Sequence, residues 1–104
     1  MERKMVTAEI SIIPLGTGST ALSKYVALCL ETLKDHKNIR YLLTPTCTIV
    51  QGELDQVFDV VREMHEVPFK NGVFRVITSL KIDDRRDKEL SLEERVRAVE
   101  EKLK

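Results

Sequence analysis

The chain has 104 residues, which leaves room for one hydrophobic core, and we expect a single domain over residues 1–104. Its 17 basic and 17 acidic side chains cancel to a net charge of zero, which argues against nucleic acid or an anionic membrane as a partner. Hydrophobic residues make up 42% of the chain, as is typical of a globular protein, and no apolar run is long enough to span a bilayer.

The first predicted strand covers residues 6–13, where apolar and polar residues alternate. Pro14 is expected to end this strand, because proline has no N–H to donate to a sheet. After a glycine-containing loop, Ser19 or Thr20 is expected to cap a helix that ends near residues 35–38. The apolar positions of this helix recur at helical spacing: Leu22, Val26, Cys29 and Leu33.

Residues 39–50 have the composition of a strand but are interrupted by a Thr-Pro-Thr sequence at residues 44–46. This pattern predicts either two short strands joined by a tight turn or one strand with a bulge. A second helix is expected after Gly52, and Pro68, with the Asn-Gly pair beyond it, is expected to close the helix. The predicted buried stripe of this helix is Leu54, Val57, Phe58, Val61 and Met64.

Residues 73–82 form the last predicted strand, and a charged connector follows at residues 83–87. Ser91 and Glu94 have the spacing of a capping box, which predicts a third helix. The apolar residues of that helix share one face: Leu92, Val96, Val99 and Leu103. The element order, βαββαβ followed by a helix, predicts an α+β ferredoxin-like sandwich in which two helices cover one side of a four-stranded antiparallel sheet.

The opposite side of the predicted sheet is left uncovered by these two helices. It would carry a mixture of polar and apolar side chains: Thr7, Glu9, Ser11, Ile13, Arg75, Ile77, Ser79 and Lys81. This mixture is too polar for a core and in part too apolar for free solvent. We therefore expect copies of the chain to associate through this face, with any pocket lying between the subunits.

The loop at residues 16–20 invites comparison with phosphate-binding loops, because a glycine-rich turn that opens a helix commonly binds an anion. It lacks the lysine of a P-loop, the third glycine of a dinucleotide-binding loop and the arginine that an acylphosphatase loop requires. We therefore interpret it as a tight turn, with its backbone N–H groups left as candidates for binding a small anion or a hydroxyl group.

The chain offers no set of residues typical of catalysis or metal binding. His36 and His65 each lie near the expected end of a helix, where a protonated imidazole is favoured, and neither has a ligand-type neighbour at metal-binding spacing. No nucleophile–base pair is recognisable, so we expect no enzymatic activity, no metal site and no cofactor. Cys29 and Cys47 lie in apolar segments and are expected to be buried free thiols of a cytoplasmic protein.

The hydroxyl-rich segment that contains Thr46 and Thr48 is the most suggestive candidate site. In a strand these side chains alternate with Cys47, so if Cys47 faces the helices, both threonines lie on the uncovered face. There they would join Glu9 and Ser11. Either the threonines simply favour strand structure, or the four residues form a polar ligand-binding cluster around a small molecule.

The charged connector contains a second candidate site, formed by Arg85 and Arg86. These side chains are suited either to ion pairs with neighbouring carboxylates or to binding an anion. RNA-recognition motifs share the βαββαβ order, but the first strand here lacks the aromatic residues on which bases stack, so no nucleic-acid partner is expected.

Several short motifs follow one another along nearly the whole chain from Met5. They are Val6-Thr7-Ala8-Glu9-Ile10-Ser11, Ile13-Pro14-Leu15-Gly16, Tyr41-Leu42-Leu43-Thr44-Pro45, Val50-Gln51-Gly52-Glu53 and Lys81-Ile82-Asp83-Asp84-Arg85-Arg86-Asp87. Their order and spacing resemble the thiamine-binding protein family. The resemblance implies a ferredoxin-like fold, a cytoplasmic homotetramer, and binding of thiamine or its hydroxymethylpyrimidine moiety without catalysis. The ligand would then lie near Glu9, Ser11, Thr46 and Thr48.

Our leading hypothesis is therefore a non-enzymatic, self-associating protein that binds thiamine or a pyrimidine precursor. The alternative is a regulatory or sensor module that binds an anion or metabolite at the interface of the oligomer. An enzyme with an unrecognised site is the third hypothesis.

Overall fold

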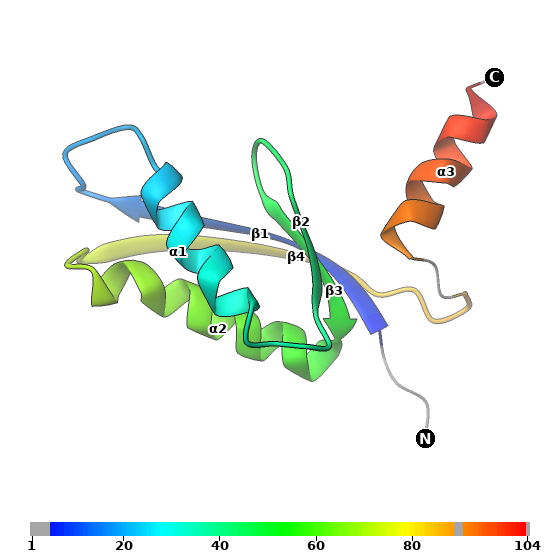
Figure 1. Ribbon diagram of the computed structural model, residues 1–104, viewed down its shortest axis with the longest axis horizontal. Helices are drawn as coiled ribbons and strands as arrows, with labels where there is room; N and C mark the ends of the chain where they lie inside the picture. Colours follow the sequence, from blue (N-terminus) through cyan, green and yellow to red (C-terminus); the bar gives the residue numbers. More distant parts are fainter. Residues whose placement is uncertain (1–4, 89–90, 104) are drawn as a thin grey trace.

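The computed structural model describes residues 5–88 and 91–103. Within them the elements follow in the order β1 (Met5–Leu15), α1 (Ser23–Leu33), β2 (Arg40–Leu43), β3 (Thr48–Glu53), α2 (Leu54–Lys70), β4 (Arg75–Asp83) and α3 (Leu92–Lys102), as Figure 1 shows. This order confirms the predicted βαββαβ arrangement with an added C-terminal helix. The Thr-Pro-Thr interruption joins two short strands, β2 and β3, which was the first of the two predicted alternatives.

The strands form a four-stranded sheet in the order β2-β3-β1-β4, and every neighbouring pair is antiparallel. The long strand β1 lies in the middle. It pairs with β3 only as far as Ile10, opposite Thr48, and then continues to Leu15 paired with β4 alone. The fold is therefore the predicted α+β ferredoxin-like arrangement, and one corner of the sheet is open where β3 and β1 part.

The core lies between the sheet and the helix α2, which packs on β1, β3 and β4. Alternate side chains of β1 point into it, as the sequence pattern predicts. The buried apolar residues that form one cluster are Val6, Ala8, Ile10, Cys29, Leu33, Ile39, Val50, Val57, Val60, Met64 and Val67. The predicted stripe of α2 was partly wrong, because the buried positions recur three and four residues apart from Val57, which leaves Phe58 45% exposed.

Two prolines lie inside elements that the sequence analysis expected them to end. Pro14 belongs to β1, at a stretch where β1 has a neighbour on one side only, and an edge position tolerates the missing N–H. Pro68 lies in the last turns of α2, which continues to Lys70. The missing N–H of Pro68 frees the carbonyl of Met64, and the Cys29 thiol donates to that carbonyl over 3.6 Å. Cys29 therefore replaces the hydrogen bond that Pro68 removes.

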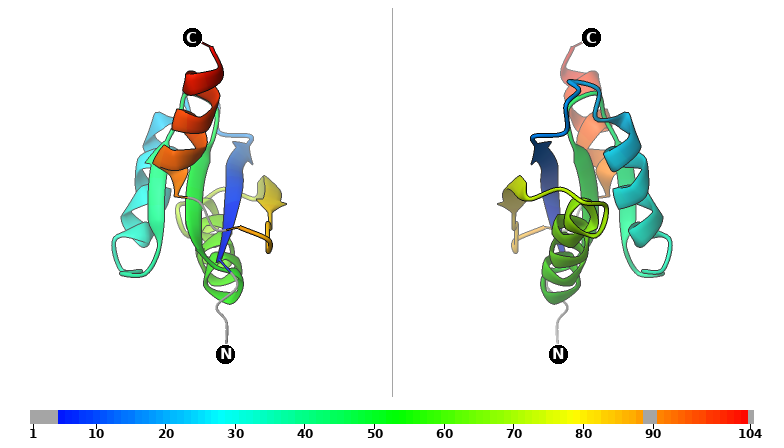
Figure 2. Two further views of the ribbon diagram at one scale, coloured as in Figure 1. Left: turned by 90° about the vertical axis from the view of Figure 1, so that its right-hand side faces the viewer. Right: turned by 90° about the vertical axis from the view of Figure 1, so that its left-hand side faces the viewer.

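The other two helices, α1 and α3, occupy different positions relative to the sheet. Helix α1 packs against α2 and leans away from the β2–β3 hairpin, as Figure 1 shows. Helix α3 lies on the other side of the sheet from α2, and the two side views of Figure 2 agree on this placement. The sheet side turned away from α2, which we call the open face, carries the predicted alternate residues of β1 and β4. It is joined by Leu42 of β2 and by Ile49 and Gln51 of β3, which lie in register with them.

Candidate functional site

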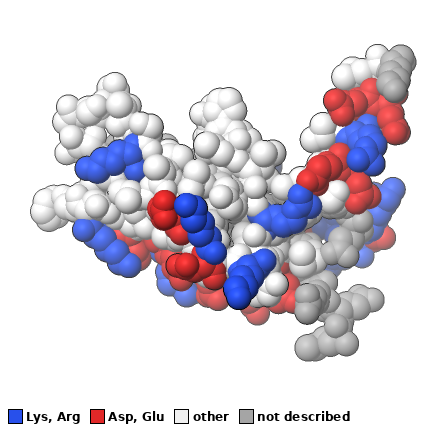
Figure 3. All heavy atoms as spheres, viewed as in Figure 1, with Lys and Arg blue, Asp and Glu red and all other residues white. Residues whose placement is uncertain are grey.

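A cavity of about 600 Å³ lies between α1, the end of β1 and the β2–β3 hairpin. The space-filling view shows the surface hollowed between the lobe at the start of α1 and the tip of the hairpin (Figure 3). Apolar side chains form its walls and floor: Val26 and Leu30 from α1 with Leu22 just before it, Ile10 and Ile12 from β1, and Met64 from α2. We call this space the α1 cavity.

The α1 cavity exists because α1 begins late and sits away from the hairpin. Ser19 or Thr20 was predicted to cap α1, and that prediction was wrong: the helix begins at Ser23 after Leu22, and no side chain caps it. The Ser19 hydroxyl instead accepts from the Ala21 N–H within the loop, over 3.0 Å. Val26 was expected in the core but is only half-buried, since it faces the cavity.

The polar part of the α1 cavity comes from the hairpin turn and from the end of β1. The turn is fixed by the Thr44 side chain, whose hydroxyl donates to the Cys47 carbonyl over 2.9 Å and accepts from the Cys47 N–H over 3.1 Å. The Ser11 hydroxyl donates to the Thr46 carbonyl over 3.3 Å, which links β1 to the turn across the open corner of the sheet. A row of hydroxyl groups thus borders an otherwise apolar space.

The predicted direction of the threonine side chains was wrong for Thr48. Thr48 pairs with Ile10 and is 5% exposed, so it faces the helices, whereas Cys47 lies on the side of Glu9. The strand begins at Thr48 because the turn bonds of Thr44 end at Cys47, and this sets the alternation. The available signal was Val50, which shares the direction of Thr48 and is fully buried.

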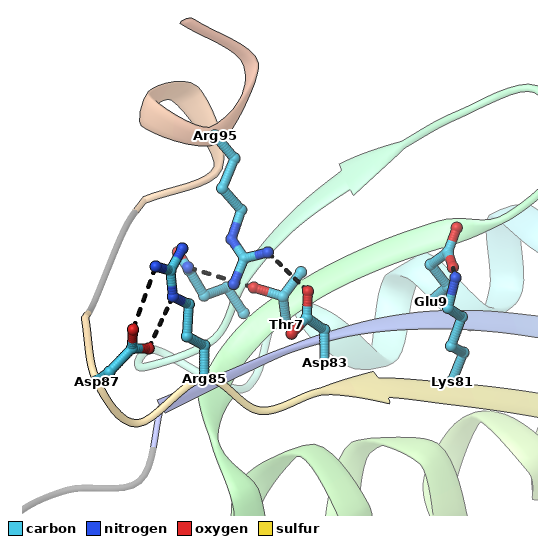
Figure 4. A network of polar contacts seen from close by, with 8 residues as sticks. Thr7, Glu9, Lys81, Asp83, Arg85, Asp87 and Arg95 are labelled. Atoms are coloured by element: carbon cyan, nitrogen blue, oxygen red, sulfur yellow. Dashed lines mark hydrogen bonds and ion pairs between the residues drawn. The ribbon is translucent and has the colours of Figure 1, made fainter. Parts of the chain in front are cut away.

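The four predicted ligand-binding residues are divided between two places. Ser11, Thr46 and Thr48 line the α1 cavity. Glu9 lies on the open face, where its carboxylate is 3.4 Å from the Lys81 ammonium, a pair visible in Figure 4. The two places meet at Cys47, which lines the cavity and whose sulfur lies 4.0 Å from Glu9 Oε1. The cavity therefore reaches the open face through the corner where β3 leaves β1.

Arg85 and Arg86 lie in the connector that follows β4, and each is paired with an aspartate nearby. Arg85 holds Asp87 at 2.7 Å, and the hydrogen bond from Arg85 lowers the pKa of that carboxyl (Figure 4). Arg86 holds Asp84 at 2.8 Å, and its own pKa is raised by that hydrogen bond. An anion that bound to either guanidinium would have to displace a carboxylate.

Of the two histidines predicted near helix ends, His36 lies just after the last turn of α1, as predicted, whereas His65 lies inside α2. His36 lies beyond α1 and is 2.6 Å from a Glu63 carboxylate oxygen, while His65 lies within α2 and is 2.6 Å from the Thr78 hydroxyl. Within residues 5–88 and 91–103, no group of three or more histidine, cysteine or acidic side chains is placed to hold a metal ion. None of the helices in the same residues has the length and hydropathy needed to cross a membrane.

Both cysteines are free thiols, as predicted, but only one is fully buried. Burial raises the pKa of Cys29 to about 11, which keeps it protonated at neutral pH and able to donate to Met64. Cys47 is half-buried at the mouth of the α1 cavity. The two thiols therefore line the same cavity from different elements and have different surroundings.

The glycine loop is a tight turn, as the sequence analysis interpreted it. Gly16 and Gly18 both have φ of 75°, a conformation that glycine adopts without steric cost. The Thr17 hydroxyl donates to the Ser19 carbonyl over 2.8 Å, which closes the loop on itself. The positive φ angles of this turn therefore account for its two glycines.

A family model described as thiamine-binding protein matches residues 8–100. The UPF0045 protein of Methanothermobacter thermautotrophicus is 46% identical over 100 residues, which are 95% of this chain and all of that protein. YqgV of Bacillus subtilis, also a UPF0045 protein, is 41% identical over 102 residues, 95% of this chain and 98% of its own length.

Solved structures of similar proteins share the fold. MJ1052 of Methanocaldococcus jannaschii superposes with a TM-score of 0.84 at 39% identity, over 94% of this chain and 98% of that chain. A candidate thiamine biosynthesis/salvage protein of Thermotoga maritima superposes with a TM-score of 0.73 at 23% identity, over 91% of this chain and 98% of that one. Because the family model covers most of its length, the chain belongs to the thiamine-binding protein family.

Proposed function

We propose that this protein binds thiamine, or the hydroxymethylpyrimidine moiety of thiamine, in the α1 cavity without converting it chemically. The observation that carries the proposal is the cavity itself, whose volume of about 600 Å³ lies in the range of small-molecule sites. The family to which the chain belongs is named for thiamine binding, and this supports the ligand class.

The chemistry of the walls favours a neutral ring inside the cavity. The described residues that line it are uncharged, with apolar side chains on α1 and β1 and hydroxyl groups on the hairpin, on Ser11 of β1 and on Ser23 of α1. An aminopyrimidine has apolar faces and an edge of donors and acceptors, which would meet Ser11, Thr46 and Thr48. The thiazolium cation of thiamine would extend through the mouth at Cys47 toward the Glu9 carboxylate.

Isothermal titration with thiamine and with hydroxymethylpyrimidine tests the site. We expect saturable heat from the wild-type protein and at least a tenfold loss of affinity in Val26→Trp, whose indole would fill the cavity. Glu31→Trp is the matched control, because Glu31 lies on the same helix, is exposed and does not line the cavity. The proposal would be overturned if neither compound gave heat at millimolar concentration. It would also be overturned if Val26→Trp and Glu31→Trp lost affinity equally.

Glu9→Gln tests the proposed orientation of thiamine, in which the thiazolium cation lies toward Glu9. Glu9 is exposed and already paired with Lys81, so its contribution should be that of a surface charge pair, about 0.2–1 kcal/mol. Thiamine affinity should fall two- to fivefold while affinity for the uncharged pyrimidine is unchanged. An equal loss of affinity for both compounds would mean that Glu9 does not interact with the thiazolium cation.

We further propose that the protein acts in the cytoplasm as a homotetramer. The half-apolar open face supports self-association, because such a face is suited to contact with another copy. The two free thiols support a reducing compartment. Native mass spectrometry of protein from its own source reads the subunit number and any retained ligand together, and a monomer would contradict the assembly.

A further inference from the structure

Helix α1 is attached firmly to the rest of the molecule at its C-terminal end. Cys29 and Leu33 belong to the core and are 3% and 1% exposed. The Cys29 thiol donates to the Met64 carbonyl of α2 over 3.6 Å. Just beyond the helix, His36 Nε2 lies 2.6 Å from a carboxylate oxygen of Glu63, which also belongs to α2. Contacts of three kinds therefore hold the last turns of α1 on α2.

The first turns of α1 lack such attachments. Leu22 and Val26 are half-buried and border the α1 cavity instead of belonging to the core. Of the described helices and strands, only α2 packs closely against α1. No side chain caps the start of the helix, so its first N–H groups have no side-chain acceptor. A segment with few buried contacts opens at low free energy, so the start of α1 is the end that can move.

The loop of residues 16–22, which leads from β1 to α1 in Figure 1, has the properties of a hinge. Gly16 and Gly18 both have φ of 75°, and a Cβ at either position would meet no atom within 4 Å. The hydrogen bonds of residues 16–21 join Thr17, Ser19 and Ala21 to one another, and within the described residues none reaches another element. Hinges are typically a few loop residues at the end of an element, which absorb a change of φ and ψ.

The wall of the α1 cavity that lies opposite α1 is fixed, in contrast. The Thr44 hydroxyl closes the hairpin turn on Cys47 with hydrogen bonds of 2.9 and 3.1 Å. The Ser11 hydroxyl joins this turn to β1 by donating to the Thr46 carbonyl over 3.3 Å. The cavity of about 600 Å³ therefore has one braced wall and one wall whose near end is held by a loop alone. Figure 3 shows the surface hollowed between the two.

The apolar side chains that border the cavity favour closure over a ligand. Leu22, Val26 and Leu30 are half-buried where they line it, and contact with an apolar ring would remove their remaining surface from water. A flat ligand contacts both walls more fully when the start of α1 moves toward the hairpin. Such a ligand binds the closed form more tightly and shifts the population toward it.

We propose that α1 is a lid over the α1 cavity, which pivots on its attachment to α2 so that its start closes toward the hairpin over a bound ligand. The inference rests on the proposed function for the identity of that ligand, whereas the pivoting belongs to the free protein as well. Ser23 lies about 15 Å from Leu33 along the helix, so a tilt of about 15° moves the start of α1 by about 4 Å. Release of the ligand then requires α1 to reopen.

Distances between two spin labels, measured by pulsed electron paramagnetic resonance in full-length Cys47→Ser protein, test the lid. Leu42→Cys on β2 carries the reference label, and the second label is placed near the start of α1 at Lys24→Cys or at its end at Lys34→Cys. All three labelled positions are exposed. Cys29 stays unlabelled, because it is buried and its pKa is about 11. Dilution with unlabelled protein removes distances between copies.

Saturating thiamine should shorten the distance from position 24 to position 42 by about 4 Å and narrow its distribution, because the lid closes. The distance from position 34 to position 42 is the matched control and should stay unchanged, since that end of α1 is fixed on α2. In the free protein, the distribution measured from position 24 should be the broader of the two, because the open lid pivots.

The lid and the proposed function fail in different ways. If thiamine binds in the titration but neither distance changes, the lid is overturned and the proposed function stands. If thiamine and the pyrimidine give no heat, the proposed function is overturned, and the free protein decides on the lid. A distribution from position 24 that is broader than the one from position 34 would then support the pivot, and two equally narrow distributions would overturn it.

Discussion

Pro68 removes one hydrogen bond from α2, and a thiol from another helix restores it. The Met64 carbonyl would be unpaired in the core without the Cys29 sulfur, which lies 3.6 Å away. The high pKa of Cys29, about 11, keeps the donor proton in place at any physiological pH. A single residue pair thus joins α1 to α2 next to the floor of the cavity.

A double-mutant cycle between these residues has a definite expected outcome. Cys29→Ala should destabilise the protein by about 1–3 kcal/mol, because it leaves the Met64 carbonyl unpaired. Pro68→Ala restores an N–H to α2, so its cost should be smaller by about 1 kcal/mol in the Cys29→Ala background than in the wild type. Urea unfolding measures both. Additivity within about 0.3 kcal/mol would contradict the hydrogen bond, and Cys47→Ala serves as a control that should be additive with Pro68→Ala.

The helix starts differ in how their first N–H groups are satisfied. Helix α3 has a complete capping box, in which the Ser91 hydroxyl accepts from the Glu94 N–H over 3.1 Å and the Glu94 carboxylate accepts from the Ser91 N–H over 3.2 Å. Helix α1 has no side-chain cap, although Ser19 or Thr20 was predicted to provide one. Since none of the described residues of α3 is fully buried, its cap contributes a large share of its local stability.

Ser91→Ala and Ser19→Ala should therefore behave differently. Loss of a serine cap costs about 1 kcal/mol, so amide exchange at the start of α3 should accelerate about fivefold in Ser91→Ala. Ser19→Ala should leave the amides of α1 unchanged, because the Ser19 hydroxyl accepts only within the loop. Hydrogen exchange followed by NMR measures both. Faster exchange of α1 amides in Ser19→Ala would show that the predicted cap forms after all.

Elements whose pattern is local were predictable from the sequence, and the candidate site was not. The alternation of β1 and the Ser91 capping box each depend on a few neighbouring residues, and both were predicted correctly. The direction of the Thr48 side chain depends on the residue at which the turn closed by Thr44 ends and β3 begins. The α1 cavity depends on how far α1 stands from the hairpin, which is decided by its packing on α2. No spacing of apolar residues within α1 encodes that distance.

Charge is distributed unevenly over the whole molecule. The described buried residues carry no carboxylate, amine or imidazole, and the two polar ones, Thr48 and Gln51, are uncharged. Acidic residues instead hold α3 and its connector in place. Hydrogen bonds from Arg40, from the Ser91 backbone and from Arg85 respectively lower the pKa values of Glu93, Glu94 and Asp87. Acid should therefore act on the attachment of α3 before it acts on the sheet.

The pH dependence follows from the direction of these pKa changes. A carboxyl group whose pKa is lower in the folded state stabilises that state above the ordinary carboxyl pKa, and this contribution is lost as the pH falls through the lowered value. Titration from pH 6 to about pH 3 should therefore loosen residues 92–103 while the β1 amides stay protected. NMR shifts of both regions along one titration measure the separation. The Glu93→Gln, Glu94→Gln double variant should show the loosened α3 already at pH 6, with little further change in acid. A single transition shared by α3 and β1 would contradict the separation, because it would mean that the attachment and the core respond to the same groups.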